Sequence, residues 1–387
     1  MPTVSGDLRA LNRVRLLRAV HEGGATRTRA QLTRDLELAR GTASVLVGEL
    51  AAASLLIESP AAEHGRGRPT MVPGAHPGGP QALAVDLRED EWEIAVCELG
   101  GAARTVETRA HDRTPEGALH PLGQVLRTLV TGRTVGVGLA IAGPVRQGER
   151  VDIAHLGWRE VDVAGLLGLG ATPLTVGNDA RLAGLAEARR GALRGTKVGL
   201  HLHVAFDPGG SLLIDGWPVT GATGRAGEYG HMPLVPGDEP CLCGATGCWS
   251  LQVGANALLR HLGLPYGQGH GRAEAEQVLS RTDAPARRAV ERVASALGSG
   301  IGALVNAHDP DLVSVSGFGG DLLEPGSFRT AYLRALMGMH REAPARVVAS
   351  ELGWRGPLIG AMESVFDGFL TPGRVEAWRH ARMQSVM

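Results

Sequence analysis

Three of the four cysteines of this chain lie within eight residues of one another, ten residues after a histidine. The segment is EYGHMPLVPGDEPCLCGATGCWS, residues 228–250, and its candidate ligands are His231, Cys241, Cys243 and Cys248. Three thiolates and one imidazole are the donor set that tetrahedral zinc prefers. Gly244 and Gly247 allow the tight turn that would bring the sulfurs around one ion. All four positions would be filled, so the spacing predicts a structural zinc ion rather than a catalytic one.

The alternative for this segment is a set of buried free cysteines beside an unrelated histidine. A disulfide framework fits less well, because cytosolic thiols stay reduced. Cys97 lies alone in an apolar run and is expected in a protein core. The close spacing and the flanking glycines favour the metal site.

The composition is that of a globular protein of two or three domains. The 387 residues are 43% hydrophobic and 20% charged, and the formal net charge is -1. No apolar run is long enough for a membrane-spanning helix, and the first residues do not have the layout of a signal peptide. We therefore expect a cytoplasmic protein with no membrane partner.

The first 72 residues have the pattern of three helices followed by a hairpin. Residues 8–21 carry apolar side chains near helical spacing, with Leu8, Leu11, Val14 or Leu17, and Val20 on one face and Arg9, Arg13, Arg15 and Arg18 on the others. A second helix should begin at Thr28, which has capping-box spacing to Gln31, and a third should run from about residue 40 to 53. SLLIESPAAEHGRGRPTMVPG then reads as strand, turn and strand. This order predicts a winged helix-turn-helix domain over residues 1–72.

In such a domain the third helix enters the major groove of DNA. Early residues of this helix that would face the bases are Arg40, Thr42 and Ser44, and the residues expected on its buried side are Val45, Leu46 and Leu50. The hairpin tip GRGRP presents Arg66 and Arg68 between glycines, which suits a narrow minor groove or the phosphates. Residues 1–80 hold ten Arg against seven Asp and Glu, which also favours DNA. The alternative is a solvated basic loop on a small helical domain.

The rest of the chain alternates between strand-like and helical segments. PGAHPGGP, residues 73–80, is rich in Pro and Gly and reads as a linker. Strand-like runs such as ALAVDLRE, EWEIAVCEL and TVGVGLAIAG follow, and PLTVGNDA leads into the helical run ARLAGLAEARRGA. This alternation predicts an α/β fold around a buried sheet.

Several of these motifs resemble the ROK family of bacterial repressors and sugar kinases. GRAGEYGHMPL and CLCGATGCWS resemble its signature, GVGLAIAGPV its strand and turn before the sugar site, and VGNDARLAGLAE its Asn-Asp segment. The resemblance implies a two-lobed actin-like, RNase H-like domain with a sugar in the cleft between the lobes. We assign the first lobe to residues 81–190, completed by a C-terminal helix over 362–387, and the second lobe, with the zinc site and dimer contacts, to 191–361.

By this resemblance, Asn178, Asp179, Glu228 and His231 would bind sugar hydroxyls, and His231 would also bind zinc. Carboxylates and amides suit that role, because they can accept paired hydroxyl hydrogen bonds. Asp179 matches the aspartate that serves as the base in the kinases of the family.

The phosphate-binding segments depart from the kinase pattern. Arg88 in VDLREDEW stands where the family kinases have the first glycine of a phosphate loop. In HVAFDPGGSLL, bulkier or charged residues replace the expected small ones, namely Phe206, Asp207 and Pro208. Only the late turn keeps its glycines, Gly317, Gly319 and Gly320. Phosphoryl transfer needs close backbone approach to ATP, so these changes favour an inactive kinase-like domain and a repressor.

Two departures fall in the sugar pocket itself. Ser250 replaces a glutamate of the family signature, and His155 stands where asparagine is frequent. One interpretation is a different effector, such as a sugar phosphate or sugar acid, which a glutamate would repel. The other is a lobe that binds no ligand and serves only dimerisation.

The sequence thus predicts a zinc-containing homodimeric repressor, or a tetramer built from two dimers, that binds a double-stranded operator and responds to a sugar-like effector. Two alternatives stay open at this point. One is a sugar kinase with an appended DNA-binding domain, and the other is a DNA-binding regulator that needs no effector.

Overall fold

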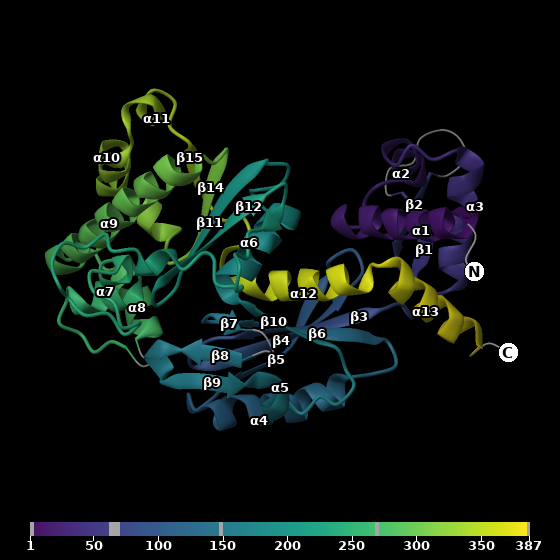
Figure 1. Cartoon of the computed structure of the whole chain (residues 1–387), viewed down its shortest axis with the longest axis horizontal. Helices are drawn as coiled ribbons and strands as arrows, with labels where there is room; N and C mark the ends of the chain where they lie inside the picture. Colours follow the sequence, from purple (N-terminus) through teal and green to yellow (C-terminus); the bar gives the residue numbers. More distant parts are fainter. Residues whose placement is uncertain (1–3, 62–69, 147–149, 268–270, 385–387) are drawn as a thin grey trace.

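The computed structural model describes residues 4–61, 70–146, 150–267 and 271–384. It has a small N-terminal domain at one end and two larger lobes that are joined by helices between them (Figure 1). Each lobe is built on a five-stranded sheet.

The N-terminal domain has the three helices and the hairpin that the sequence predicts. Its elements are α1 (Val4–Glu22), α2 (Arg29–Asp35), α3 (Arg40–Ala52), β1 (Leu56–Pro60) and β2 (Met71–Ala75). The two strands pair antiparallel. Thr28 caps α2: its hydroxyl accepts the Gln31 amide proton, and the Gln31 side chain accepts the Thr28 amide proton, so the predicted capping box is confirmed.

The sequence pattern assigned some side chains of this domain to the wrong environment. Leu8 and Leu11 are exposed, and Val45, expected inside, is 50% exposed. On α3 the buried stripe passes through Ala43, Leu46, Val47 and Leu50, which leaves Val45 on the opposite side of the helix. Arg13, expected on an outer face of α1, is buried because the C-terminal helix covers it.

Lobe 1 is a mixed sheet with helices on both faces. Its strands are β3 (Gln81–Leu87), β4 (Glu91–Glu98), β5 (Ala103–Ala110), β6 (Thr134–Ile141) and β10 (Leu174–Asn178), in the order β10-β6-β3-β4-β5. The pairs β3–β4 and β4–β5 are antiparallel, and the pairs β3–β6 and β6–β10 are parallel. One face packs on α4 (Pro115–Leu129) and α5 (Val163–Leu167). A smaller sheet beside it comprises β7 (Val145–Arg146), β8 (Arg150–Ile153) and β9 (Trp158–Asp162), with the short helix η1 (Ala154–Leu156).

Lobe 2 carries the cysteine segment and a second sheet. Its strands, in spatial order, are β13 (Trp217–Pro218), β12 (Pro208–Ile214), β11 (Val198–Val204), β14 (Leu312–Gly317) and β15 (Arg346–Ala349). Its helices are α7 (Ala255–Arg260), α8 (Arg272–Ser280), α9 (Ala284–His308), α10 (Gly326–Ala335) and α11 (Gly338–Glu342), with the short helices η2 (Tyr229–His231), η3 (Trp249–Leu251), η4 (Asp321–Leu323) and η5 (Gly353–Arg355).

Two helices pack between the sheets of the lobes. These are α6 (Asp179–Arg190) and α12 (Gly356–Phe369). Helix α12 packs on β6 and β3 of lobe 1 and on α6, and α6 in turn packs on β11 and β12 of lobe 2 (Figure 1). The cleft between the lobes therefore has these two helices at its base.

The C-terminal segment differs from the single helix expected over residues 362–387. It forms α12 and then α13 (Pro372–Gln384), with a break at residues 370–371. Proline lacks the amide proton that helix continuation needs and disfavours helical backbone in the residue before it, so the break falls before Pro372. Helix α13 leaves lobe 1 and packs against α1 of the N-terminal domain.

The N-terminal domain shares one hydrophobic core with lobe 1. A continuous cluster of buried side chains runs from Leu17 and Val20 of α1 to Met362 and Phe366 of α12. The predicted linker 73–80 is shorter than expected, because β2 includes residues 73–75. These contacts hold the N-terminal domain against lobe 1 rather than on a loose tether.

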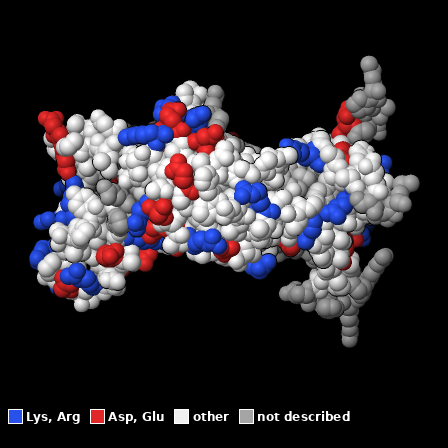
Figure 2. Space-filling model, turned by 90° about the horizontal axis from the view of Figure 1, so that it is seen from below, with Lys and Arg blue, Asp and Glu red and all other residues white. Residues whose placement is uncertain are grey.

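The near-neutral charge is spread over the surface. On the face drawn in Figure 2, positive and negative side chains are interspersed. Within the described ranges no helix combines the length and the apolar character that crossing a bilayer requires.

Candidate functional site

The junction of β10 and α6 places two polar side chains in the cleft. Asn178 caps α6, since its Oδ1 accepts the amide proton of Arg181 at 3.0 Å, and its Nδ2 donates to the carbonyl of Gly143 at 3.3 Å. Asp179 Oδ1 accepts the amide proton of Ala180 at 2.6 Å. Burial, assisted by the nearby Glu89 carboxylate, raises the pKa of Asp179 to about 8. Near neutral pH this carboxyl can therefore carry a proton and donate a hydrogen bond as well as accept one.

All six residues expected to bind a ligand line one cavity between the lobes. Its volume is about 530 Å³, within the range of small-molecule sites. Lobe 1 and the start of α6 contribute His155, Asn178 and Asp179, and lobe 2 contributes Glu228, His231 and Ser250. Burial raises the pKa of Glu228, although His231 and Arg225 oppose this shift. Ser250 is buried, whereas Glu228 keeps part of its surface exposed even though the surrounding protein displaces water from its carboxyl group.

Two more carboxylates reach this cavity that the sequence had not assigned to it. Glu89 is buried, and its Oε1 lies 3.5 Å from His155 Nε2. Burial by itself would raise the pKa of Glu89 and lower that of His155, but their mutual attraction outweighs burial in both residues, so the pKa of Glu89 is lowered and that of His155 is raised. Burial also raises the pKa of Asp207, whose Oδ1 lies 3.5 Å from the Asn256 amide. Glu89 comes shortly after strand β3, and Asp207 comes shortly after strand β11. Their place after a strand end is the sequence feature that could have identified them as cavity residues.

The predicted metal ligands are brought together. The ligand atoms of His231, Cys241, Cys243 and Cys248 all lie within 4.8 Å of one another. Cys241 Sγ lies 3.7 Å from His231 Nδ1, and the Sγ atoms of Cys243 and Cys248 are 3.6 Å apart. Thiolates at the usual zinc distance in a tetrahedron are separated by about 3.8 Å. The donors therefore fit a tetrahedral zinc ion, and His231 would keep Nε2 available for a ligand in the cavity.

The metal site also adjoins Ser250. Its hydroxyl oxygen lies 3.9 Å from Cys241 Sγ. Gly244 and Gly247 both have positive φ, +95° and +68°, which the turn between the cysteines requires.

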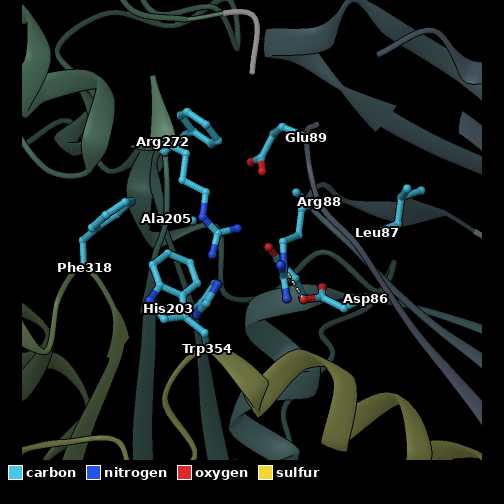
Figure 3. A pocket seen from close by; sticks show the side chains of 12 residues that line it. Asp86, Leu87, Arg88, Glu89, His203, Ala205, Arg272, Phe318 and Trp354 are labelled. Atoms are coloured by element: carbon cyan, nitrogen blue, oxygen red, sulfur yellow. Dashed lines mark hydrogen bonds and ion pairs between the residues drawn. The ribbon is translucent and has the colours of Figure 1, made fainter. Parts of the chain in front are cut away.

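The region that corresponds to the kinase phosphate loops is filled by side chains. From lobe 1, the Arg88 guanidinium donates to Asp86 at 2.8 Å and to Glu93 at 3.0 Å, and it also pairs with Glu91. Burial raises the pKa of Asp86 to about 6 even though Arg88 opposes this shift. Arg88 therefore pairs with three carboxylates. Figure 3 shows its contact with Asp86.

Aromatic side chains of lobe 2 fill the opposite side of the same region. The guanidinium of Arg272 lies over the Trp354 ring, 4.3 Å from its centroid, and Trp354 also packs edge-on against Phe318 and His203. Arg272 and Glu89 face each other across the remaining space (Figure 3). That space is about 20 Å³, enough for about one water molecule.

The residues expected to contact DNA lie partly within the described chain. Arg40, Thr42 and Ser44 are all exposed on the first turns of α3. Arg66 and Arg68 lie outside the described residues.

Fold and site together define a two-lobed protein of the sugar-kinase type that carries an N-terminal winged helix. A model of the ROK family matches residues 82–367, which is more than half of the sequence. The chain belongs to the ROK family.

Relatives of two kinds resemble this chain. The glucokinase of Streptomyces coelicolor is 30% identical over 310 residues, which cover 73% of this chain and 96% of the glucokinase. The xylose repressor of Bacillus subtilis is 22% identical over 366 residues, which cover 89% of this chain and 92% of the repressor. The chain thus resembles both repressors and kinases, and the match to the repressor extends over more of its length.

A solved structure has the same overall architecture. It is a ROK family transcriptional regulator described as a homologue of the E. coli MLC protein, and it superposes with a TM-score of 0.71 at 20% identity, covering 96% of this chain and 99% of that one. This likeness shows that the fold of nearly the whole chain is that of the regulator.

Proposed function

We propose that this protein is a DNA-binding transcriptional repressor whose affinity for its operator is controlled by a sugar-like effector. The observation that carries the proposal is a winged helix packed on a kinase-like cleft whose phosphate region is filled. The length of the match to the Bacillus subtilis xylose repressor supports it.

Several features of the cleft speak against phosphoryl transfer. The phosphates of ATP need backbone amides that approach closely, whereas here Arg88, Phe206 and Trp354 line a space for about one water molecule. The carboxylates of Asp207 and Glu89 would also repel phosphate oxygens. We infer that the domain binds an effector without turning it over.

The cavity between the lobes, which is lined by all six expected ligand-binding residues, has the chemistry of a polyol site. Asn178, Asp179 and Glu228 offer acceptors for hydroxyl protons, and a protonated Asp179 or His231 Nε2 can donate to ring or hydroxyl oxygens. Loss of the family glutamate at Ser250 and gain of imidazole at His155 would select an effector different from that of a glucokinase.

Zinc, held by His231 and the three cysteines, would order the loop that lines one side of this cavity. It would supply no reaction, because all four positions of a tetrahedral ion would be taken by the protein.

An operator-binding protein of this kind would act as a dimer, since two winged helices then bind half-sites separated by whole turns of DNA. We place the dimer contacts in lobe 2, where a groove of about 840 Å³ lies between α9 and the loop that carries the cysteines. Effector binding would favour one arrangement of the lobes and so shift the spacing of the two α3 helices.

The first experiment selects the preferred duplex from random-sequence DNA and titrates it against the protein with and without neutral and phosphorylated monosaccharides. We expect one sugar to weaken binding, and we expect replacement of Thr42 or Ser44 by Ala to change the sequence preference. The exposed Thr128 of α4, replaced by Ala, is the control that should change nothing.

The second candidate function is a sugar kinase with an appended DNA-binding domain, which the 30% identity to a glucokinase favours. ATP turnover with glucose measures it directly. Turnover at a rate usual for kinases would refute the repressor proposal in its present form. Operator binding indifferent to every sugar would instead indicate an effector-independent regulator.

A further inference from the structure

Helix α6 begins in the effector cavity and ends at the DNA-binding domain. Its N-cap Asn178 and first residue Asp179 line the cavity. Its last two residues, Arg189 and Arg190, contact α1. The helix has 12 residues, so about 18 Å separates its two ends. One rigid element therefore joins the two places that an effector-controlled repressor must connect.

The middle of α6 is packed at backbone distance on both sides. A Cβ added at Gly360 of α12 would overlap the carbonyl of Leu182, and one added at Gly184 would lie 2.8 Å from the Ser211 side chain of β12. Such close packing leaves no room for α6 to bend or slide independently of its neighbours. A change at its N-terminus is therefore carried along the helix as a movement of the whole element.

At the far end, Arg190 bonds to three separate segments of the chain. Its Nε donates to Glu363 Oε1 of α12 at 2.5 Å, its Nη2 to the carbonyl of His21 at 3.2 Å, and its Nη1 to the carbonyl of Gly100 at 3.2 Å. A Cβ at Gly101 would overlap the guanidinium, so the β4–β5 turn closes over Arg190. Arg190 thus connects α6, α12, α1 and the sheet of lobe 1.

The α1 side of this contact is a buried histidine. His21 Nδ1 accepts the amide proton of Gly100 at 3.0 Å, and its Nε2 lies 3.2 Å from Glu363 Oε2 and 3.1 Å from Arg190 Nη2. The side chains of His21 and Glu363 are each only 3% exposed. Burial by itself would raise the pKa of Glu363, but His21 and Arg190 outweigh it and hold that pKa below its usual range. A buried charge with all its partners in place tolerates few other arrangements.

A second set of charges joins the same helices nearer the surface. Arg189 pairs with Glu22 of α1 at 3.1 Å and with Asp367 of α12 at 3.6 Å, and Arg18 of α1 pairs with Asp367 at 2.7 Å. Helix α1 is therefore attached to both α6 and α12, and it follows any movement of these two helices.

We propose that α6 transmits the state of the effector cavity to the DNA-binding domain, and that the cluster of Arg190, Glu363 and His21 is the joint that makes α1 follow it. This inference rests on the proposed effector-controlled repressor function. It adds to that function the particular residues through which the two sites are coupled.

The test compares the wild type with Glu363→Gln and Arg190→Lys in the full-length protein. Glu363→Gln removes the charge and replaces one of the two acceptor oxygens by an NH2 group that cannot accept, and Arg190→Lys keeps the charge but loses the planar set of donors. Operator affinity is measured with and without D-xylose, D-glucose, N-acetyl-D-galactosamine and glucose 6-phosphate, and binding of each sugar is measured separately by calorimetry. We expect the active sugar to weaken operator binding of the wild type roughly tenfold, a size common for coupled sites.

In the two variants we expect the sugar still to bind, while its effect on operator affinity falls to roughly threefold or less. Hydrogen exchange provides a second measurement: amides of α1 should respond to the sugar in the wild type and not in the variants. Arg341→Met is the matched control, because Arg341 bonds to the carbonyls of Leu333 and Leu336 within lobe 2, away from α1. Thermal unfolding identifies any variant that does not fold. The variant that does fold then shows whether the cluster couples sugar binding to operator affinity.

The outcomes separate this inference from the function on which it rests. A wild-type response that persists at full size in folded variants would overturn the role of the joint and leave the repressor function intact. A wild type that binds its operator but responds to none of the sugars would overturn the effector function, and this inference with it.

Discussion

Arg88 follows strand β3 and is surrounded there by Asp86, Glu91 and Glu93. Its side chain is 16% exposed, so the three carboxylates depend on it for neutralisation. These pairs stabilise the hairpin of β3 and β4.

Replacing Arg88 by Ala should lower the free energy of unfolding by about 3 kcal/mol, because it leaves buried carboxylates without a counter-charge. Urea denaturation measures the change. Arg109→Ala on the neighbouring strand is the control. The Arg109 side chain is 49% exposed, so its replacement should lower the free energy of unfolding by less than about 1 kcal/mol. Equal losses in the two variants would contradict the role assigned to Arg88.

Asp179 gives the cleft a measurable pH dependence. Its pKa is about 8 in the folded protein against an ordinary value of 3.8, so between these values the folded state holds a proton that the unfolded state has lost. The contribution of Asp179 to stability is therefore present at low pH and is lost as pH rises toward 8. Relative to Asp179→Asn, the wild type should lose stability from about pH 5 to 8, by at most about 1.4 kcal/mol per pH unit. Parallel stability profiles for the two proteins would show that the pKa of Asp179 is not raised.

At the scale of elements, the loop from η2 to η3 has little regular structure of its own. It holds its shape through turns, through the short bridge between Pro240 and Thr246, and through the ligand cluster. A metal ion would supply the cross-links that strands or helices supply elsewhere.

Cys243→Ser should therefore abolish binding of one zinc ion per chain and make the loop sensitive to protease. Cys243 is exposed, so its replacement removes a ligand without opening a cavity. Native mass spectrometry measures the number of zinc ions bound per chain. Limited proteolysis measures how readily the loop is cleaved. Cys97→Ala, in the core of lobe 1, should keep the metal. Zinc retained equally by both variants would exclude the proposed ligand set.

At the scale of the whole molecule, the N-terminal domain shares its hydrophobic core with lobe 1. Leu17 and Val20 pack in the same cluster as Met362 and Phe366, and Trp378 of α13 donates to the carbonyl of Ala53 at 3.1 Å. A movement of α12 or α13 is therefore a movement of the surface on which α1 rests.

A fragment of residues 1–80 should accordingly be poorly structured at 25 °C, since it exposes apolar surface and leaves Arg13 and His21 without their partners in α13 and α12. Circular dichroism with thermal melting tests the fragment. In the intact protein, hydrogen exchange should show α1 and α12 opening together. Cooperative melting of the isolated fragment would indicate an independent domain instead.

Much of the architecture follows from local patterns in the sequence. The capping box at Thr28 and the runs that become β3, β4, β6 and β10 are recognisable because period and spacing depend on neighbouring residues. The edge strand β5 and the short strands β7 to β9 were not recognised, since their exposed or irregular side chains leave no clear period. The geometry of the cysteine cluster also agrees with its spacing, because four ligands within 18 residues can meet only around a tight turn.

By itself, then, the sequence determined the family, the α/β fold with its winged helix, and the residue types available to a metal and a sugar. Only the tertiary structure decided that Val45 is exposed, that Arg13 is buried, and that Glu89 and Asp207 reach the cavity between the lobes. It also decided that residues 21, 190 and 363 form one buried cluster. The physical reason is that burial and ion pairing depend on segments far apart in the chain, and no local periodicity records which of them meet.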